Sequence, residues 1–254
     1  MVTRKSRAEI ARMRQAGRIV AEVLALVEDA LKPGVTTGHL DQLAEEHIRK
    51  AGATPSFKGY PGINPRRPFP ASLCISIDDE IVHGVPGERT IRDGQVVSID
   101  AGAIVDGWHG DAARTFFVGE PPAPVARLID TTRQAMEAGI AAAITGRHIE
   151  DISAAVEDVA RPGGYGIIRQ FVGHGIGTDM HEEPQVPNYR TGRKGRKLEP
   201  GLCLAIEPML TLGDYRAHIL DDDWTVATVD GSLAAHFENT IAVTENGPEV
   251  LTAL

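Results

Sequence analysis

The sequence contains few cysteines and no long apolar run. Its two cysteines, Cys74 and Cys203, lie far apart and outside any Cys-x-x-Cys motif. This excludes a disulfide scaffold and a zinc site built from thiolates, and it fits a reducing compartment. No run of about 18 apolar residues occurs, and the basic N-terminus lacks the apolar region of a signal peptide. We therefore expect no membrane segment and a cytoplasmic location.

Positive charge is also scarce in this sequence. It has 26 Lys and Arg residues against 35 Asp and Glu residues, for a formal net charge of -9. Such a balance argues against broad nucleic-acid binding, so we expect no DNA partner. The length of 254 residues is ample for a hydrophobic core, and we expect one domain over residues 1–254.

The first half of the sequence reads as two helices followed by strands. Apolar residues at helical spacing follow a capping box formed by Ser6 and Glu9, and the same spacing recurs between Leu40 and Ile48. Val, Ile and Phe between turn signals then indicate strands over residues 73–118.

The second half repeats this order after the proline-rich segment EPPAP at residues 120–124. Helical patterns over residues 128–140 and 152–159 precede further strands. Helices grouped apart from strands predict an α+β domain, with helices covering one face of a mainly antiparallel sheet. The repeated order predicts two pseudo-symmetric halves, about residues 1–122 and 123–254.

Two carboxylates interrupt the stretch SIDAGAIVDGWHGDAARTFFVG, residues 98–119, which otherwise reads as buried strand. Asp106-Gly107 predicts a two-residue hairpin turn. With that turn, Asp100 and Asp111 become diagonal neighbours on one face, roughly 7–8 Å apart at the backbone. Two ionised carboxylates so placed repel each other, and they need a shared proton or a cation. A different register would instead leave one acid exposed.

The second half adds three isolated ionisable residues in strand-like surroundings. They are His174 in FVGHGIGTDMHEEP, Glu207 in LCLAIEPML and Glu238 in AAHFENTIAVTENG. Each one alone is more often an ordinary polar group than a ligand. Together with the hairpin acids they make one imidazole and four carboxylates, a set that suits two divalent ions of the Mn, Fe or Co type bridged by carboxylates.

Six motifs in family order make the sequence resemble the type I methionine aminopeptidases, a metallopeptidase family with the pita-bread fold. The motifs are VHGVP (82–86), SIDAGAIVDGWHGDAARTF (98–116), GHGIG (173–177), MHEEP (180–184), IEPM (206–209) and FENTIAVTENGPEVLT (237–252). The resemblance covers nearly the whole chain. It implies a monomeric hydrolase with two divalent metal ions (Co²⁺, Mn²⁺, Fe²⁺ or Zn²⁺). Such an enzyme removes the N-terminal methionine from nascent polypeptides whose second residue is small.

The resemblance also implies a role for each residue of the site. The implied metal ligands are Asp100, Asp111, His174, Glu207 and Glu238. Asp111 and Glu238 bridge the ions, and Glu207 also accepts and passes on a proton. His181 contacts the substrate carbonyl and its developing oxyanion, and His83 lies near the scissile amide nitrogen. The residues that match positions of the methionine pocket are Phe57, Tyr60, Phe69, Cys74, Met180 and Trp224.

Two segments raise separate expectations. Ile63–Pro68 reads as an insert beside the pocket, where it either changes the pocket's shape or forms an ordinary surface loop. Arg190–Lys197 is a basic loop on an acidic chain, and it is either a contact for the ribosome or a solvated loop.

The histidines expected to be ordinary polar groups are His39, His47, His109, His148, His218 and His236.

Two other functions fit the same fold. A prolidase or Xaa-Pro aminopeptidase usually carries a sizeable extra N-terminal domain, and here the ligand-bearing region begins too early for one. A binding protein that has lost its chemistry should lack metal ligands, whereas all five are present in this sequence together with both family histidines.

Overall fold

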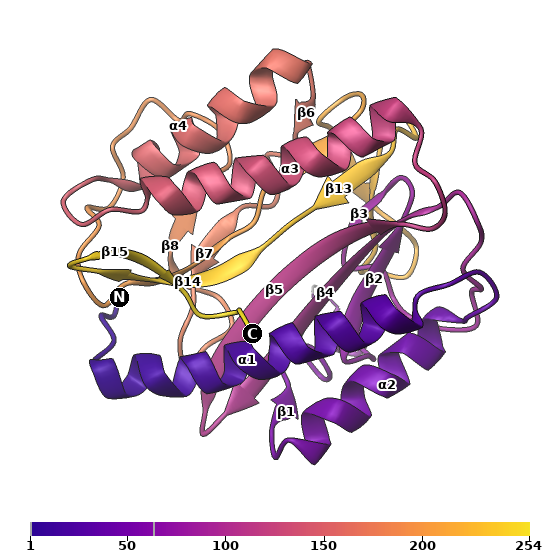
Figure 1. Ribbon diagram of the computed structural model, residues 1–254, viewed down its shortest axis with the longest axis horizontal. Helices are drawn as coiled ribbons and strands as arrows, with labels where there is room; N and C mark the ends of the chain where they lie inside the picture. Colours follow the sequence, from indigo (N-terminus) through magenta and orange to yellow (C-terminus); the bar gives the residue numbers. More distant parts are fainter. Residues whose placement is uncertain (1, 63) are drawn as a thin grey trace.

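Helices cover one side of the strands in the computed structural model, which describes residues 2–62 and 64–254 (Figure 1). The helices of the described residues are α1 (Arg7–Ala30), α2 (Thr37–Lys50), α3 (Ala123–Ala142) and α4 (Ile149–Ala160), followed by the 3₁₀ turn η1 (Arg161–Gly163). Each matches a helix that the sequence predicts. None of them combines the length and the apolar character needed to cross a bilayer.

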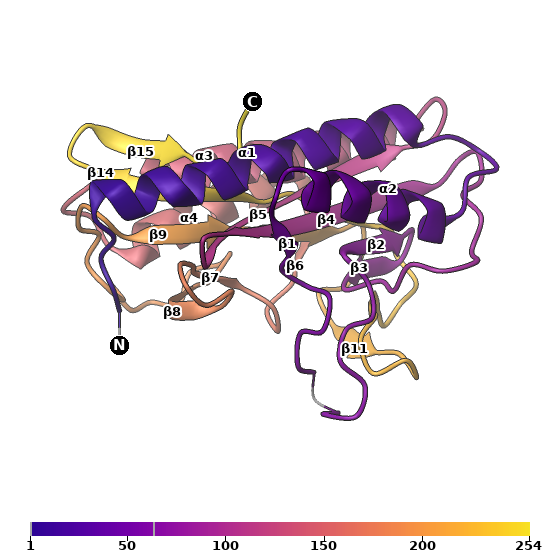
Figure 2. The same cartoon turned by 90° about the horizontal axis from the view of Figure 1, so that it is seen from below.

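The strands form four groups that are antiparallel throughout, so the predicted α+β class is confirmed. The strands of the first half are β1 (Thr54–Pro55), β2 (Leu73–Ile77), β3 (Glu80–Val82), β4 (Val96–Val105) and β5 (Trp108–Phe117). Those of the second half are β6 (Gly166–Ile167), β7 (Gly173–Gly175), β8 (Glu182–Val186), β9 (Cys203–Ile206), β10 (Met209–Thr211), β11 (Ala217–Ile219), β12 (Val226–Thr228), β13 (Ala234–His236), β14 (Asn239–Thr244) and β15 (Gly247–Val250). Figure 2 shows α1 and α2 on one side of β4, β5 and β9, with β15 at the level of α1, and β8 and β11 on the other side.

Local sequence signals fix the start of α1 and the turn between β4 and β5. The Ser6 side chain accepts a hydrogen bond from the Glu9 amide, and the Glu9 carboxylate accepts one from the Ser6 amide, which confirms the capping box. Asp106 and Gly107 have φ of 49° and 80°, as a two-residue hairpin turn of this kind requires. Asp111 then pairs with Gly102, which is the predicted register.

The two halves meet where β5 runs beside the segment that enters β14, between α1 and α3 (Figure 1). The Glu238 amide donates to the Ala113 carbonyl at 3.0 Å, and the Ala113 amide donates back to Glu238 at 3.3 Å. The Thr240 hydroxyl donates to the Asp111 carbonyl at 2.8 Å. Because side chains alternate along strands, this register puts Glu238 on the same face as the two hairpin acids. A boundary between the halves at residues 122 and 123 stays a prediction.

Close contact between α1 and β5 depends on glycine. A Cβ on Gly110 of β5 would lie only 2.6 Å from the backbone nitrogen of Gly17 in α1. A Cβ on Gly17 would in turn overlap the Leu251 carbonyl. The helix can therefore approach the sheet closely only because both positions lack a side chain.

We expect Gly17→Ala to destabilise the protein, although alanine normally favours a helix interior. The added methyl group must displace backbone, so the free energy of unfolding should fall by about 2 kcal/mol, as in overpacked cores. Urea unfolding measures this. Gly87→Ala is the control, because a Cβ at Gly87 meets no atom within 4 Å. An unchanged or raised stability of Gly17→Ala would contradict the packing argument.

Candidate active site

One cavity of about 100 Å³ brings together all thirteen residues that the sequence singled out as site residues. Its lining consists of Phe57, Tyr60, Phe69, Cys74, His83, Asp100, Asp111, His174, Met180, His181, Glu207, Trp224 and Glu238. They come from both halves of the chain and from loops as well as strands. Their roles remain predictions, but their convergence in one cavity is what those roles require.

The ionisable side chains reach the cavity from the central strands. Asp100 lies on β4, Asp111 on β5 and His174 on β7, whereas Glu207 directly follows β9 and Glu238 lies between β13 and β14. Ligand atoms of Asp111, His174 and Glu238 lie within 4.8 Å of one another. The Nε2 atom of His174 lies 3.3 Å from Oε1 of Glu207. The predicted ligands are thus close enough together to surround metal ions.

The carboxylates of this cluster outnumber the positive charges near them: the Arg114 guanidinium favours the charged form of Glu238, but its effect on the pKa is smaller than that of burial. Among the described residues, no lysine or arginine forms an ion pair with Asp100, Asp111, Glu207 or Glu238. Buried oxygens of the first two and of Glu238 have no hydrogen-bond partner. Burial of anionic oxygen without a partner is strongly unfavourable, so this arrangement calls for protons or cations.

The pKa shifts of these groups agree with a need for protons or cations. Burial raises the pKa of Asp100 to about 7. Burial, together with the neighbouring carboxylates, raises the pKa values of Asp111, Glu207 and Glu238 well above their ordinary range. Burial lowers the pKa of His174 to about 3, so its imidazole is neutral, as a metal ligand must be. An oxygen-rich set with neutral imidazole fits divalent ions of the first transition series.

Two further histidines line the cavity. His83 follows β3 with a φ of 61°, and its ring meets that of Phe171 edge to face at 5.5 Å. The Nδ1 atom of His181 lies 2.7 Å from the Tyr60 hydroxyl, a hydrogen bond that leaves Nε2 available to a ligand. The His181 ring also lies 4.4 Å from that of His174, so it borders the carboxylate cluster.

The rest of the cavity is apolar. The rings of Phe57 and Phe69 meet at 6.4 Å, and those of Phe69 and Trp224 meet at 5.0 Å, both edge to face. Buried Cys74 and Met180 pack in the same cluster. A wall of aromatic rings and sulfur atoms suits an unbranched thioether side chain.

The predicted insert reaches this wall. Ile63 lies outside the described residues, but the remainder of Ile63–Pro68 is described. The Arg67 carbonyl accepts a hydrogen bond from Trp224 Nε1 at 3.0 Å, and its guanidinium pairs with Asp223 at 3.2 Å. Asn64 also donates to Asp223. The segment therefore contacts a pocket residue and its neighbour, although residues 65–68 are exposed, and an effect on the shape of the pocket stays a prediction.

Sequence reasoning missed one residue of the cluster, His236. We expected it to be an ordinary polar group, yet its Nε2 atom is buried and has no hydrogen-bond partner among the described residues. That atom lies 3.8 Å from Oε2 of Glu207 and 3.9 Å from Oε2 of Glu238. The available signal was its position two residues before Glu238, a spacing that places strand side chains on one face.

The loop that carries Met180 and His181 is fastened by a buried ion pair. The Lys5 ammonium lies 2.5 Å from Oε2 of Glu182, and the two side chains are only 4% and 11% exposed. Oε1 of Glu182 accepts hydrogen bonds from the backbone amides of Thr178 and Asp179. A residue near the chain's start thus holds the turn that presents two cavity residues.

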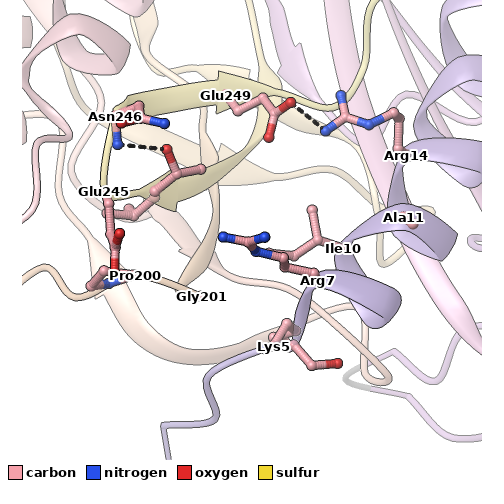
Figure 3. A pocket seen from close by; sticks show the side chains of 13 residues that line it. Lys5, Arg7, Ile10, Ala11, Arg14, Pro200, Gly201, Glu245, Asn246 and Glu249 are labelled. Carbon is pink, nitrogen blue, oxygen red and sulfur yellow. Dashed lines mark hydrogen bonds and ion pairs between the residues drawn. The ribbon is translucent and has the colours of Figure 1, made fainter.

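A wider hollow lies elsewhere, between the first turns of α1 and the hairpin of β14 and β15 (Figure 3). The Arg7 side chain projects into it, and Arg14 pairs with Glu249 across it at 2.6 Å. Within the part of the chain that is described, no cluster of metal-ligating side chains lines this hollow. Its described lining therefore lacks the grouped metal-ligating side chains of the cavity that contains Asp100, Asp111, Glu207 and Glu238.

This fold and this cluster of ligands define a metallopeptidase, and the chain belongs to metallopeptidase family M24, which it matches over residues 11–245. Within that family it resembles the methionine aminopeptidases. The methionine aminopeptidase of Clostridium acetobutylicum is 50% identical over 253 residues, which are 99% of each chain. The crystal structure of the Thermotoga maritima methionine aminopeptidase matches with a TM-score of 0.95 and 40% identity, covering 100% of both chains. The resemblance predicted from the six motifs is confirmed.

The alternative function, that of a prolidase or Xaa-Pro aminopeptidase, is less well supported. The prolidase of Pyrococcus furiosus matches with a TM-score of 0.77 at 22% identity. The match covers 99% of this chain but 65% of the prolidase. Identity this low shows a shared fold and no more.

We expect Lys5→Met to lower the free energy of unfolding by about 3 kcal/mol, because removing one partner leaves the Glu182 carboxylate buried and unpaired. Urea unfolding of both proteins measures the loss. Arg14→Met is the matched control, since it removes an ion pair whose side chains are 43% and 49% exposed. Exposed pairs contribute little, so this control should stay close to the wild type. Equal stability of both variants would show that burial of the Lys5 pair has no consequence.

Proposed function

We propose that this protein removes the N-terminal methionine from polypeptides whose second residue is small, as a hydrolase that uses two divalent metal ions. One observation carries this proposal. A single cavity joins buried, uncompensated carboxylates to a wall of aromatic and sulfur-containing side chains. The first part suits metal-assisted hydrolysis, and the second suits a methionine side chain.

The residues that would hold the ions are Asp100, Asp111, His174, Glu207 and Glu238. The ions would be of the Mn²⁺, Fe²⁺, Co²⁺ or Zn²⁺ type, and Asp111 and Glu238 would be the ligands that the two ions share. Divalent ions bound there would lower the pKa of water and polarise the carbonyl of the scissile bond. Support comes from the convergence of the ligand atoms and from membership of a metallopeptidase family.

The protein's own groups then position the substrate and move the proton. Glu207 accepts the proton of the attacking water and passes it to the leaving amine. His181 donates from Nε2 to the substrate carbonyl oxygen and to the oxyanion that develops there, while Tyr60 holds its other nitrogen. His83 lies near the scissile nitrogen. The small cavity admits the end of a chain, which explains removal of a single residue.

Other features follow from the same proposal. Residues 1–254 act as one catalytic domain made of two pseudo-symmetric halves, about residues 1–122 and 123–254. The protein works as a monomer in the cytoplasm on nascent polypeptide N-termini. The insert Ile63–Pro68 contributes to the pocket through Trp224.

We expect metal-stripped protein to release methionine from Met-Gly-Met-Met only after Mn²⁺, Co²⁺, Fe²⁺ or Zn²⁺ is added back. Ala-Gly-Met-Met should not be cleaved, because alanine leaves the apolar pocket unfilled. Glu207→Gln should reduce kcat by at least about 100-fold through loss of proton transfer. Glu22→Gln is the control for a lost carboxylate, because Glu22 is a half-buried residue of α1 that lies outside the cavity and pairs with Arg18. Absence of cleavage with every metal, at full metal loading, would refute the proposed function.

A ribosome contact through Arg190–Lys197 is also part of the proposal. Arg190 pairs with Asp158 and Arg196 with Glu199. Among the described residues, Arg193, Lys194 and Lys197 have no ion-pair partner and are exposed. Three free cations in one loop can attract the phosphates of ribosomal RNA even on an acidic protein.

Changing Arg193, Lys194 and Lys197 together to Glu should therefore reduce co-sedimentation with ribosomes at low salt. Reversal of three exposed basic residues elsewhere, at Arg12, Lys32 and Lys50, provides the control with the same change in net charge. Equal sedimentation of both triple variants would show that the loop is merely solvated.

A further inference from the structure

His236 is a buried imidazole that neither the predicted ligand set nor the proposed reaction uses. Its side chain is 2% exposed, and its Nε2 atom has no hydrogen-bond partner among the described residues. A polar atom buried without a partner is costly, so native structures usually supply a partner or a ligand for it. Two carboxylates of the predicted ligand set, those of Glu207 and Glu238, lie within 4 Å of this Nε2 atom.

The position of His236 is fixed by its backbone. Its amide donates to the Thr115 hydroxyl at 2.8 Å, and the same hydroxyl donates to the His236 carbonyl at 2.7 Å. The residue also pairs with Met209 across β13 and β10. The ring therefore belongs to the rigid centre of the protein and not to a mobile loop.

The distances from Nε2 to the carboxylates indicate what lies between them. They are 3.8 Å to Oε2 of Glu207 and 3.9 Å to Oε2 of Glu238, which is too long for direct hydrogen bonds. Two donors that each lie about 2.1 Å from a shared ion are roughly 3.0–3.6 Å apart for coordination angles of about 90–120°. The observed separations exceed this range by only a few tenths of an ångström, so a small approach of the side chains would let them share an ion. Ligand atoms of His236, Glu207 and Glu238 in fact lie within 4.8 Å of one another.

We propose that His236 donates Nε2 to a metal ion that it shares with Glu207 and Glu238, so that the centre has two imidazole ligands instead of one. This inference rests on the proposed function only in taking the same cluster to bind two divalent ions. Four carboxylates already balance the charge of two such ions. A neutral imidazole completes the coordination without adding negative charge, and imidazole suits Mn, Fe, Co and Zn alike.

The proposal is tested on the protein loaded with two equivalents of Co²⁺, without substrate. Paramagnetic Co²⁺ shifts the solvent-exchangeable N–H protons of coordinated imidazoles far outside the normal proton NMR range. The wild type should show two such resonances, from His174 and His236, and His236→Gln should show one. His109→Gln is the matched control, because His109 is also buried but is bonded through Nδ1 to Ser56 at 3.0 Å. It should keep both resonances.

Calorimetric titration provides a second readout. His236→Gln should weaken binding of one of the two ions by at least about tenfold, a loss typical even of groups that only support a metal ligand. His109→Gln should bind both ions as the wild type does.

A single shifted resonance in the wild type that persists in His236→Gln would overturn the proposal. That result would identify His236 as a neighbour of the ligands and not as a ligand. The number of shifted resonances in the wild type shows whether His236 is a ligand even if His236→Gln does not fold. Neither measurement uses a substrate, so failure to release methionine would refute the proposed function and leave this test intact.

Discussion

The seam between the two halves, where β5 runs beside the segment that enters β14, gathers four carboxylates that have little access to water. Asp111 and Glu238 are 3% and 2% exposed, and the Glu207 side chain is 13% exposed. Asp100 and Asp111 come from neighbouring strands of one half, and the register of β5 against the other half adds Glu238 to the same face. Glu207 approaches from the end of β9. Burial raises the pKa of each carboxyl group, and neighbouring carboxylates raise those of Asp111, Glu207 and Glu238 further. Cations or protons are therefore needed to offset the cost of burying these four groups together.

The side of the seam that faces the helices contains the polar contacts that hold it rigid. Arg114 donates to the carbonyls of Ala113 and Glu238 and to the side chain of Asn239. Thr252, near the end of the chain, donates to the same Asn239 oxygen at 2.9 Å. The backbone at Glu238, a predicted metal ligand, is thus fixed by side chains from three separate segments. Such support matters because small displacements of ligands are costly in metal sites.

Loops form the other side of the cavity, and each of these loops is held by a hydrogen bond or an ion pair. Lys5 holds Glu182 and with it the turn before β8, while Tyr60 contacts His181 from the segment between β1 and β2. Trp224 is held by the Arg67 carbonyl. Paired strands and the residues next to them thus position the predicted metal ligands. Loops held by individual hydrogen bonds and ion pairs shape the predicted pocket for the methionine side chain.

The sequence alone determined the parts whose geometry is local. Strand alternation and the Asp106-Gly107 turn predicted the Asp100 and Asp111 pair, because hairpin register follows from turn chemistry. Isolated ionisable residues in strand-like surroundings indicated His174, Glu207 and Glu238, and the resemblance to the family implied the remaining cavity residues. The structure brings all of them together. Only the tertiary structure placed Glu238 beside Ala113, turned His236 toward the cluster and joined Lys5 to Glu182. The first and last of these contacts link segments more than a hundred residues apart. His236 lies 29 residues from Glu207, on a different strand group. No local periodicity specifies which distant strand pairs with which.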